Sequence, residues 1–233
     1  MTMKTLIIIP AYNEEESLPG VVRDLSEHMP SADVLVVNDG SLDRTVAIAR
    51  ELGIRVLDLP FNLGIGGAMQ AGYLYAWRNT YDIAVQFDGD GQHLAVEMQK
   101  LLEPIAAGKT DLVVGSRFLT PGGYKSPVFR RLGIGIFSFV LSRILDTTVT
   151  DSTSGFRAAN RKVIEFFARN YPDDYPEVEA LVLLHKMGLR IAEVAVCMRE
   201  RTGGKSSITP IRSLYYMTKV LMAIFIDLMK KVR

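Results

Sequence analysis

The chain has 233 residues, 48% of them hydrophobic and 23% charged, which fits one large α/β domain. A single cysteine, Cys197, excludes an internal disulfide; it lies in an apolar run that we expect to form a strand and to bury the thiol. No long apolar segment opens the chain, because Asn13 and three glutamates follow the first apolar run, so we expect no signal peptide and a cytosolic setting.

The net charge of +1 is unevenly distributed. Residues 199–233 contain eight Lys or Arg against two acids, and residues 117–145 contain five basic residues and no acid. Both segments are also rich in Phe, Ile, Leu and Met. Basic and apolar side chains together indicate contact with an anionic lipid surface rather than with nucleic acid.

Short apolar runs alternate with helical patterns through the first half of the chain. We expect strands at 4–9, 33–38, 55–58, 83–87 and 111–116, and helices at 17–27, from Ser41 or Asp43 to 52, at 66–79 and at 96–107. This alternation predicts a mostly parallel sheet with helices on both faces. The chain shows no internal repeat and no low-complexity linker, so we expect one domain.

Two later helices are both apolar and basic. Residues 128–145 have only eleven uncharged residues between Arg131 and Arg143, and residues 211–231 include Lys219 and Asp227. Neither supplies the roughly 20 apolar residues needed to span a bilayer. Each is compatible with an ordinary core helix, but arginines that flank an apolar middle favour helices lying in the membrane interface.

An acidic loop follows the fourth expected strand, in the sequence Gln86-Phe87-Asp88-Gly89-Asp90-Gly91-Gln92-His93. Ligands of open α/β sheets bind at the carboxyl ends of strands, and two carboxylates this close need a cation or a proton between them. Asp88, Asp90 and Gln92 offer oxygen ligands only, which favours Mg²⁺ or Mn²⁺ together with substrate phosphates. An ordinary Asp-Gly turn is the alternative. An EF-hand is excluded, because His93 and Gln99 stand where Gly and Glu are required.

Glycines at 64, 66 and 67 do not make a dinucleotide-binding motif, because the third glycine is replaced by Met69. We expect them either to bring the backbone close to a ligand or to let the helix pack tightly on the sheet.

Several motifs, in order and at the expected spacing, resemble those of family 2 glycosyltransferases. They are Pro10-Ala11-Tyr12-Asn13-Glu14, Asn38-Asp39-Gly40-Ser41, Asn62-Leu63-Gly64 and the acidic loop. Three more resemble the dolichyl- or polyprenyl-phosphate hexose synthase branch: Gly115-Ser116-Arg117, Ser154-Gly155-Phe156-Arg157 and Arg199-Glu200-Arg201-Thr202-Gly203-Gly204-Lys205-Ser206. The resemblance covers residues 4 to about 210. It implies a GT-A domain over residues 1–210, with 128–145 as an interfacial helix inside it and 211–233 as a C-terminal amphipathic helix of the same domain.

The resemblance also implies roles for individual residues on the donor side, where a nucleotide-sugar binds with Mg²⁺ or Mn²⁺. The nucleotide-binding residues would be Pro10, Tyr12, Asn13, Glu14, Asp39 and Gly66. Asp88, Asp90 and Gln92 would hold the metal on the diphosphate, and this makes Asp90 catalytic. Arg201, with Lys205 as a second candidate, would bind the diphosphate, since guanidinium and phosphate match as a bidentate pair.

On the acceptor side, Arg117, Arg131 and Arg157 would bind the phosphate of a polyprenyl phosphate, with Arg117 also catalytic. A phosphate acceptor is already anionic at neutral pH, whereas a sugar hydroxyl needs a general base. The best candidate base is Glu179, with Glu177 its neighbour, although an acid at a helix start has a purely structural explanation too. Asn38 stands where an Asp is usual, which weakens any inference about the nucleoside base.

Three functions follow as alternatives. The first is inverting, metal-dependent transfer of a hexose or N-acetylhexosamine from a UDP- or GDP-sugar, UDP being favoured, to polyprenyl phosphate. This would take place peripherally on the cytoplasmic face of the cell membrane, with a second copy of the chain or a membrane protein as a candidate partner. The second is transfer to a saccharide hydroxyl in surface polysaccharide assembly. The third is a non-catalytic nucleotide-sugar-binding module.

Overall fold

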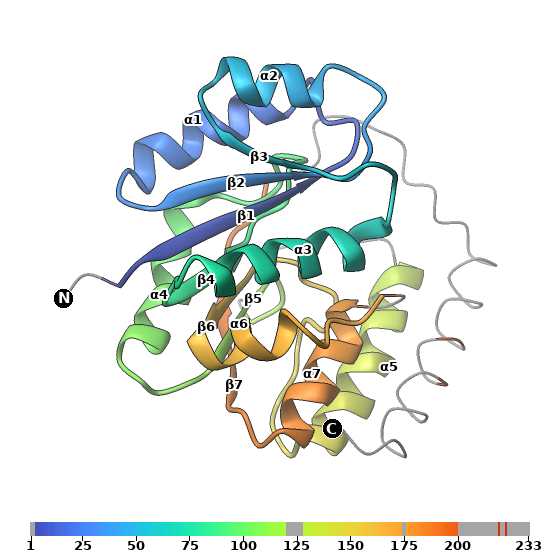
Figure 1. The fold of residues 1–233 in the computed structure, drawn as a ribbon. Helices are drawn as coiled ribbons and strands as arrows, with labels where there is room; N and C mark the ends of the chain where they lie inside the picture. The colour runs from blue at the N-terminus through green and yellow to red at the C-terminus, as the bar shows by residue number, and fades with distance from the viewer. Residues whose placement is uncertain (1–2, 120–127, 174–175, 200–218, 220–221, 223–233) are drawn as a thin grey trace.

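One sheet organises the part of the chain that the computed structural model describes, residues 3–119, 128–173, 176–199, 219 and 222 (Figure 1). Its seven strands are β1 (Thr5–Ala11), β2 (Asp33–Asn38), β3 (Arg55–Asp58), β4 (Ile83–Gln86), β5 (Leu112–Ser116), β6 (Arg157–Asn160) and β7 (Ile191–Ala195). Their order across the sheet is β3-β2-β1-β4-β6-β5-β7, and β6 is antiparallel to both of its neighbours while the other pairs are parallel. The predicted mostly parallel α/β sheet is confirmed.

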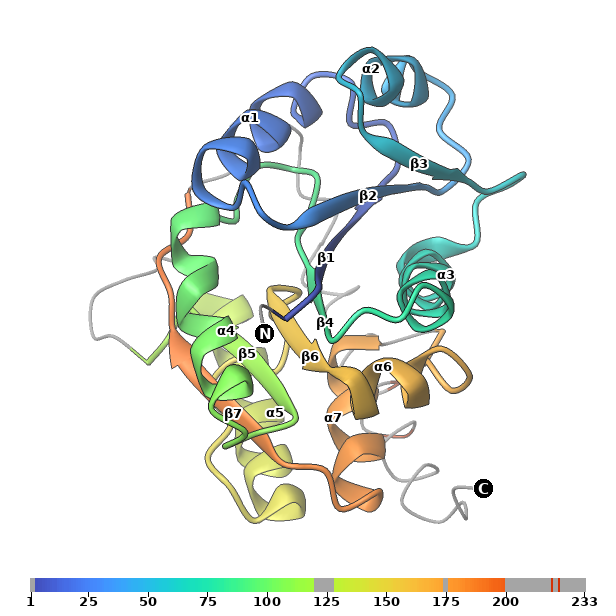
Figure 2. The same ribbon diagram turned by 60° about the vertical axis from the view of Figure 1, so that its left-hand side comes forward.

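Helices cover both faces of this sheet, as Figure 2 shows. One face carries α1 (Leu18–His28), α2 (Thr45–Glu51), the 3₁₀ turn η1 (Ala95–Glu97) and α4 (Met98–Ala106). The other carries α3 (Gly64–Arg78), α5 (Val128–Leu145), α6 (Arg161–Phe167) and α7 (Pro176–Lys186).

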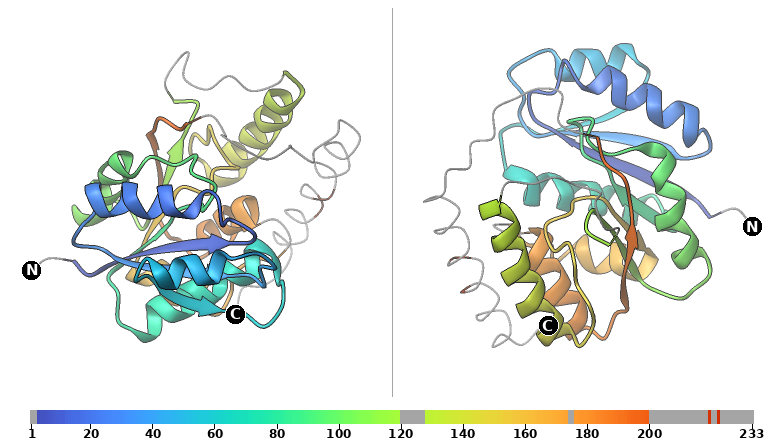
Figure 3. Two further views of the ribbon diagram at one scale, coloured as in Figure 1. Left: turned by 90° about the horizontal axis from the view of Figure 1, so that it is seen from above. Right: turned by 180° about the vertical axis from the view of Figure 1, so that it is seen from behind.

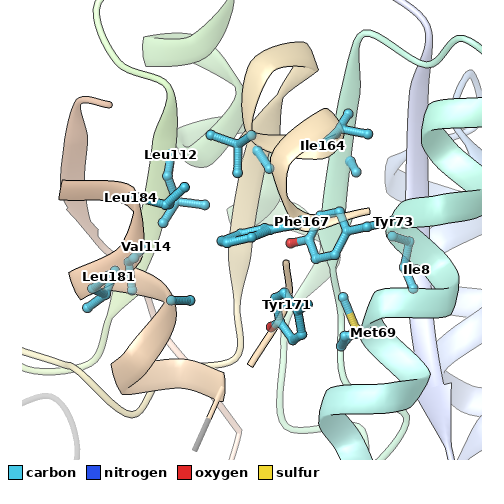
Figure 4. Close-up of a cluster of buried hydrophobic side chains, with 14 of the residues drawn as sticks. Ile8, Met69, Tyr73, Leu112, Val114, Ile164, Phe167, Tyr171, Leu181 and Leu184 are labelled. Atoms are coloured by element: carbon cyan, nitrogen blue, oxygen red, sulfur yellow. The ribbon is translucent and has the colours of Figure 1, made fainter. Parts of the chain in front are cut away.

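Alternation along the strands divides the core into two layers. In β1, Leu6 and Ile8 face the layer under α3 and α6, whereas Ile7 and Ile9 face the layer under α1 and α4, and all four are fully buried. Because β1 is covered on both faces, its sequence is a nearly continuous apolar run. Figure 4 shows the first layer, where Phe167 packs against the rings of two tyrosines, Tyr73 and Tyr171, at centroid distances of 5.1 and 4.9 Å.

Strand β6 is the main element that the sequence pattern did not predict. Its four residues, Arg157 to Asn160, include two alanines and no β-branched residue, so the usual strand signal is absent. Neighbouring strands on both sides supply its pairing, with Gln86 of β4 opposite Arg157. Asn160 then caps α6 by accepting hydrogen bonds from the backbone N–H groups of Lys162 and Val163.

Other expectations have mixed outcomes. The helix at 128–145 is confirmed, and Figure 3 shows α5 beside α7, away from α1 and α2. The prediction that Cys197 is buried in a strand was wrong, because β7 ends at Ala195 and the cysteine is exposed. The expected helix at 211–231 falls almost wholly outside the described residues. Among the helices that are described, none has the length and hydropathy needed to cross a membrane.

Candidate active site

A cavity of about 250 Å³ opens at the carboxyl ends of β1, β2 and β4. Six of the residues predicted from the sequence line it together: Pro10, Tyr12, Glu14, Asp39, Asp88 and Asp90. They come from three segments, and the parallel pairing of β1 with β2 and β4 brings the strand ends to one edge. This is where an open α/β sheet binds its ligand.

The acidic loop presents its two carboxylates to this cavity. The side chain of Asp88 is 35% exposed, and both Asp88 and Asp90 line the wall. Asp90 accepts the backbone N–H of Gln92 at 3.0 Å in a turn where Gly91 adopts a φ of +75°. The structure thus brings Gln92 to the loop through its backbone, and a metal-ligand role for its side-chain oxygen stays a prediction.

His93 closes the loop from inside rather than facing the cavity. Its Nδ1 accepts a hydrogen bond from the backbone N–H of Asp88 at 3.0 Å. Its Nε2 lies 3.5 Å from the carboxylate of Asp88. The ring stacks on Phe156 at a centroid distance of 4.7 Å, and burial lowers the pKa of the imidazole. A neutral ring that accepts at Nδ1 carries its proton on Nε2. His93 therefore holds the backbone of Asp88 by a hydrogen bond and lies beside its carboxylate.

The loop after β1 is tied to the loop after β2 by hydrogen bonds. The backbone N–H of Asn13, a residue with a φ of 57°, donates to the hydroxyl of Ser41, and its side-chain oxygen accepts the N–H of Leu42. The backbone N–H of Glu14 donates to the hydroxyl of Thr45 at 2.9 Å. Asn13 thus shapes the loop that presents its neighbours, and its direct contact with the donor stays a prediction.

Asp39 links the end of β2 to the start of α3. Its two carboxylate oxygens accept the backbone N–H groups of Leu63 at 2.6 Å and Gly64 at 2.9 Å. These two bonds fix the orientation of the carboxylate at the N-terminus of α3. Its contact with the nucleoside base remains an expectation.

Asn38, the departure from the usual Asp, is used inside the protein. It is 2% exposed, its amide donates to Asp58 at 2.7 Å, and its oxygen accepts the N–H of Ser41. A larger groove of about 680 Å³ lies between the segments around Ser41 and Asn62 and shares Tyr12 with the first cavity. Tyr12 therefore lines both recesses.

The glycine at 66 meets a packing requirement. A Cβ there would lie 2.5 Å from the carbonyl oxygen of Pro172 and 2.6 Å from that of Asp173, so the loop before α7 can cross the start of α3 only over a glycine. Ile65 and Ala68 of the same helix line the cavity. Gly66 thus packs against this loop and not on the sheet as expected, and donor binding by it stays a prediction.

Glu177, rather than Glu179, enters the cavity wall. Both lie in the first turn of α7. Burial raises the pKa of the Glu177 carboxyl; the positive charge of Arg157 opposes this rise and the negative charge of Asp88 adds to it. The structure thus supports the neighbour of the favoured candidate as the acid nearest the donor, and catalysis by Glu179 stays a prediction.

Two of the predicted acceptor arginines are held inside the protein. Arg157 is 1% exposed and donates to the carbonyl oxygens of Ser154 at 2.8 Å and Glu177 at 2.6 Å. Arg117 forms a bidentate pair with the fully buried Asp151, at 2.6 and 2.7 Å. An acceptor phosphate would reach either guanidinium only if these contacts opened, so their acceptor roles stay predictions.

Three other predicted residues cannot be placed at the site. Arg201 and Lys205 lie outside the described residues, and the side chain of Arg131 does too, although its backbone belongs to α5.

The acids at the cavity fit a divalent ion that is completed by substrate. Among the described residues, no three His, Cys, Asp or Glu side chains converge as a preformed metal site. Two carboxylates with oxygen donors, open to a cavity, are what Mg²⁺ uses when phosphate oxygens and water complete its shell. Asp88 and Asp90 would hold such an ion.

Comparison with known proteins identifies the family. A family model described as "Glycosyl transferase family 2" matches residues 6–167, which include β1 to β6 and the cavity up to Asp90. The chain belongs to glycosyl transferase family 2. Membership makes it a glycosyltransferase, and the predicted family and enzyme class are confirmed.

Relatives in this family include proteins described as lipid-phosphate sugar transferases. A polyprenol monophosphomannose synthase of Mycolicibacterium smegmatis is 34% identical, and the match covers 89% of this chain and 82% of the relative. An undecaprenyl-phosphate mannosyltransferase of Micrococcus luteus is also 34% identical, with coverage of 89% and 88%. A UDP-N-acetylglucosamine–dolichyl-phosphate N-acetylglucosaminyltransferase of Methanococcus voltae is 33% identical, with coverage of 82% and 83%.

Solved structures confirm the fold. Glucosyl-3-phosphoglycerate synthase of Mycobacterium tuberculosis, in complex with Mn²⁺, UDP and phosphoglyceric acid, superposes with a TM-score of 0.73 at 21% identity. The match covers 97% of this chain and 78% of that one. The predicted GT-A fold is therefore confirmed.

Proposed function

We propose that this family 2 glycosyltransferase is an inverting, metal-dependent enzyme that transfers a hexose or N-acetylhexosamine from a UDP- or GDP-sugar to polyprenyl phosphate. One observation carries the proposal: the cavity gathers Asp88 and Asp90 beside Tyr12, Glu14 and Asp39 at a single sheet edge. The relatives described above as polyprenol- and dolichyl-phosphate transferases support the acceptor.

Different residues around the cavity would bind different parts of the donor. Tyr12, Glu14 and Asp39 would bind the nucleoside at the ends of β1 and β2. Asp88 and Asp90 would face the diphosphate at the end of β4. A divalent ion bound there supplies positive charge where the leaving nucleoside diphosphate becomes more negative. Arg201 and Lys205 would add further donors to the same phosphates.

The acceptor needs positioning more than proton transfer. A phosphate monoester has a second pKa of about 6, so it is already a nucleophile at neutral pH. Arg117 and Arg131 would direct it toward the sugar, with Arg157 as a third candidate. Asp151 holds the guanidinium of Arg117 at the end of β5, so this role requires the ion pair to open when the phosphate binds.

The lipid acceptor implies work at a membrane surface. We place the enzyme peripherally on the cytoplasmic face of the membrane, with α5 and the basic, apolar segment 211–233 as the parts of the domain that contact lipid. The exposed aromatic side chain of Phe139 on α5 supports this orientation.

A donor screen followed by a transfer assay tests the proposal. We expect UDP or GDP, and their sugars, to raise the melting temperature in the presence of Mn²⁺. We expect transfer of the sugar to a short polyprenyl phosphate, and loss of about a hundredfold or more in kcat in Asp90→Ala. Glu103→Ala, on the exposed part of α4, is the matched control and should retain wild-type transfer.

Three outcomes would contradict parts of the proposal. The absence of any nucleotide-dependent stabilisation rejects the donor assignment. Transfer to a saccharide hydroxyl but not to polyprenyl phosphate supports the alternative acceptor, for which Glu177, in the cavity wall, and Glu179 are the candidate general bases. Nucleotide-sugar binding with neither transfer nor metal-dependent hydrolysis supports a non-catalytic binding module.

A further inference from the structure

One acid in the cavity wall is not among the residues proposed above to bind the nucleoside or the diphosphate. Of the described residues that line the cavity, Glu177 alone comes from beyond residue 90. It reaches the cavity from the first turn of α7, whereas Tyr12 and Asp39 follow the neighbouring strands β1 and β2. The family match, which ends at residue 167, does not include it.

The order of the strands predicts which part of the donor meets this acid. Asp39 follows β2, Tyr12 follows β1 and Asp88 follows β4, and these strands are neighbours in that order. A nucleotide that runs from Asp39 to Asp88 is directed at the next strand, β6. Glu177 lies beside the first residue of β6, since its carbonyl oxygen accepts a hydrogen bond from Arg157. The group attached to the second phosphate would therefore arrive at Glu177.

A buried guanidinium holds this part of the wall in place. Besides its 2.6 Å bond to the carbonyl of Glu177, Arg157 donates to the carbonyls of Ser154 and Ser152 at 2.8 and 3.3 Å. These bonds fasten the first turn of α7 to the loop before β6. A buried cation is costly to a fold unless charges or dipoles compensate it, so its position beneath an acid of the cavity calls for an explanation.

Two buried polar atoms in this region, one of Gln86 and one of Arg157, have no hydrogen-bond partner among the described residues. Gln86, opposite Arg157 in the sheet and also in the cavity wall, has a buried side-chain oxygen that accepts no hydrogen bond within the described part of the chain. The Nη1 of Arg157 is likewise buried without an acceptor there. Ile65 and Ala68 of α3 add apolar surface. A carboxylate and an amide beside an apolar wall suit a ring with hydroxyls on its edge and C–H groups on its face.

We propose that Glu177 is a binding residue for the donor sugar, whose carboxyl group accepts hydrogen bonds from hydroxyls of the hexosyl group, and that Arg157 positions it through its backbone. The inference rests on the proposed function and deepens it, because it assigns the sugar to a different wall from the nucleotide. Hydrogen bonds to a charged carboxylate contribute about 1.5–3 kcal/mol, which corresponds to about tenfold to a hundredfold in affinity.

Calorimetric titration with paired ligands isolates this contribution. Wild type, Glu177→Gln and Glu177→Asp are titrated, with Mn²⁺ present, with UDP, UDP-glucose, UDP-N-acetylglucosamine, GDP and GDP-mannose. We expect Glu177→Gln to weaken binding of the preferred nucleotide-sugar by about tenfold or more while the matching nucleoside diphosphate stays within about twofold. Glu177→Asp, which retains the charge on a shorter side chain, should give an intermediate loss. Glu165→Gln, an exposed acid on α6, is the control.

Each other outcome overturns the inference in a distinct way. Equal weakening of nucleotide-sugar and nucleoside diphosphate places Glu177 at the diphosphate or in the support of the fold, which the melting temperature separates. Unchanged affinity for both, with kcat reduced, makes the residue a general base rather than a sugar ligand. A wild-type protein that binds none of the five nucleotides rejects the proposed function itself, whereas unchanged affinities and an unchanged kcat in Glu177→Gln reject only the sugar site.

Discussion

Hydrogen bonds that involve backbone N–H groups hold the acidic loop and Asp39 in place. Asp90 accepts the N–H of Gln92, and His93 accepts the N–H of Asp88. Asp39 is held in the same way by Leu63 and Gly64. Because backbone groups move less than side chains, these bonds set the directions of the carboxylates before any ligand arrives.

The position of His93 leads to a prediction at this scale. His93→Phe keeps an aromatic ring against Phe156 but leaves the buried N–H of Asp88 without its acceptor. We expect a loss of about 1–3 kcal/mol in the free energy of unfolding, measured by urea denaturation. We also expect weaker Mn²⁺ binding in the presence of UDP, measured by electron paramagnetic resonance.

A surface histidine provides the control for this prediction. His28→Phe, at an exposed position on α1, should change stability by less than about 0.5 kcal/mol and leave Mn²⁺ binding unchanged. If His93→Phe matched this control in both measurements, the imidazole would have no role in holding Asp88.

At the scale of elements, a carboxylate at the start of β5 joins three strands. Asp111 accepts hydrogen bonds from the backbone and the guanidinium of Arg190, which precedes β7, and from the amide of Asn160, which ends β6. Burial alone raises the pKa of Asp111, but these hydrogen bonds outweigh it and lower the pKa from 3.8 to about 2. The ionised side chain thus helps to hold β5, β6 and β7 at the edge of the sheet.

This shift predicts how stability depends on pH. Because the folded pKa lies below the unfolded value, the contribution of Asp111 is fully present above about pH 4 and is lost as the pH falls toward 2. We expect the difference in unfolding free energy between wild type and Asp111→Asn to be greatest near neutral pH and to shrink over that interval, measured by urea unfolding at each pH. A difference that stayed constant from pH 6 to pH 2.5 would contradict the assignment. Glu165→Gln, in an exposed ion pair, should show little difference at any pH.

At the scale of the whole molecule, α5 presents two faces of different character. Phe137, Leu141 and Leu145 are buried in the core, whereas Phe139 is 63% exposed and lies 5.3 Å below the guanidinium of Arg143. Figure 3 places this helix at the end of the molecule away from α1 and α2. An exposed aromatic residue under an arginine suits the interface of an anionic membrane.

Vesicle sedimentation tests this orientation. We expect Phe139→Ser with Arg143→Ser to reduce binding to phosphatidylglycerol-containing vesicles severalfold, and the effect of Arg143 to weaken in high salt. Val96→Ser, an exposed apolar residue at the other face of the sheet, is the control and should bind as wild type does. Equal binding by the wild type, the double variant and Val96→Ser would contradict a lipid contact at α5.

Local sequence was sufficient for most of the sheet and for one wall of the site. Tyr12, Asp39, Asp88 and Asp90 each follow an apolar run that becomes a parallel strand, and parallel strands bring their carboxyl ends to one edge. Strand β6 was missed, because its pairing comes from neighbours on both sides rather than from its own residues.

The opposite wall was decided by tertiary structure. Glu177 and Glu179 are two positions apart in a helix, which puts them about 200° apart around its axis, so packing alone determines which one faces the cavity. The sequence alone does not distinguish Arg117 and Arg157 from arginines that are free to bind a phosphate. Only the fold supplies Asp151 and the carbonyl groups that hold them, because those partners depend on long-range contacts that no local pattern records.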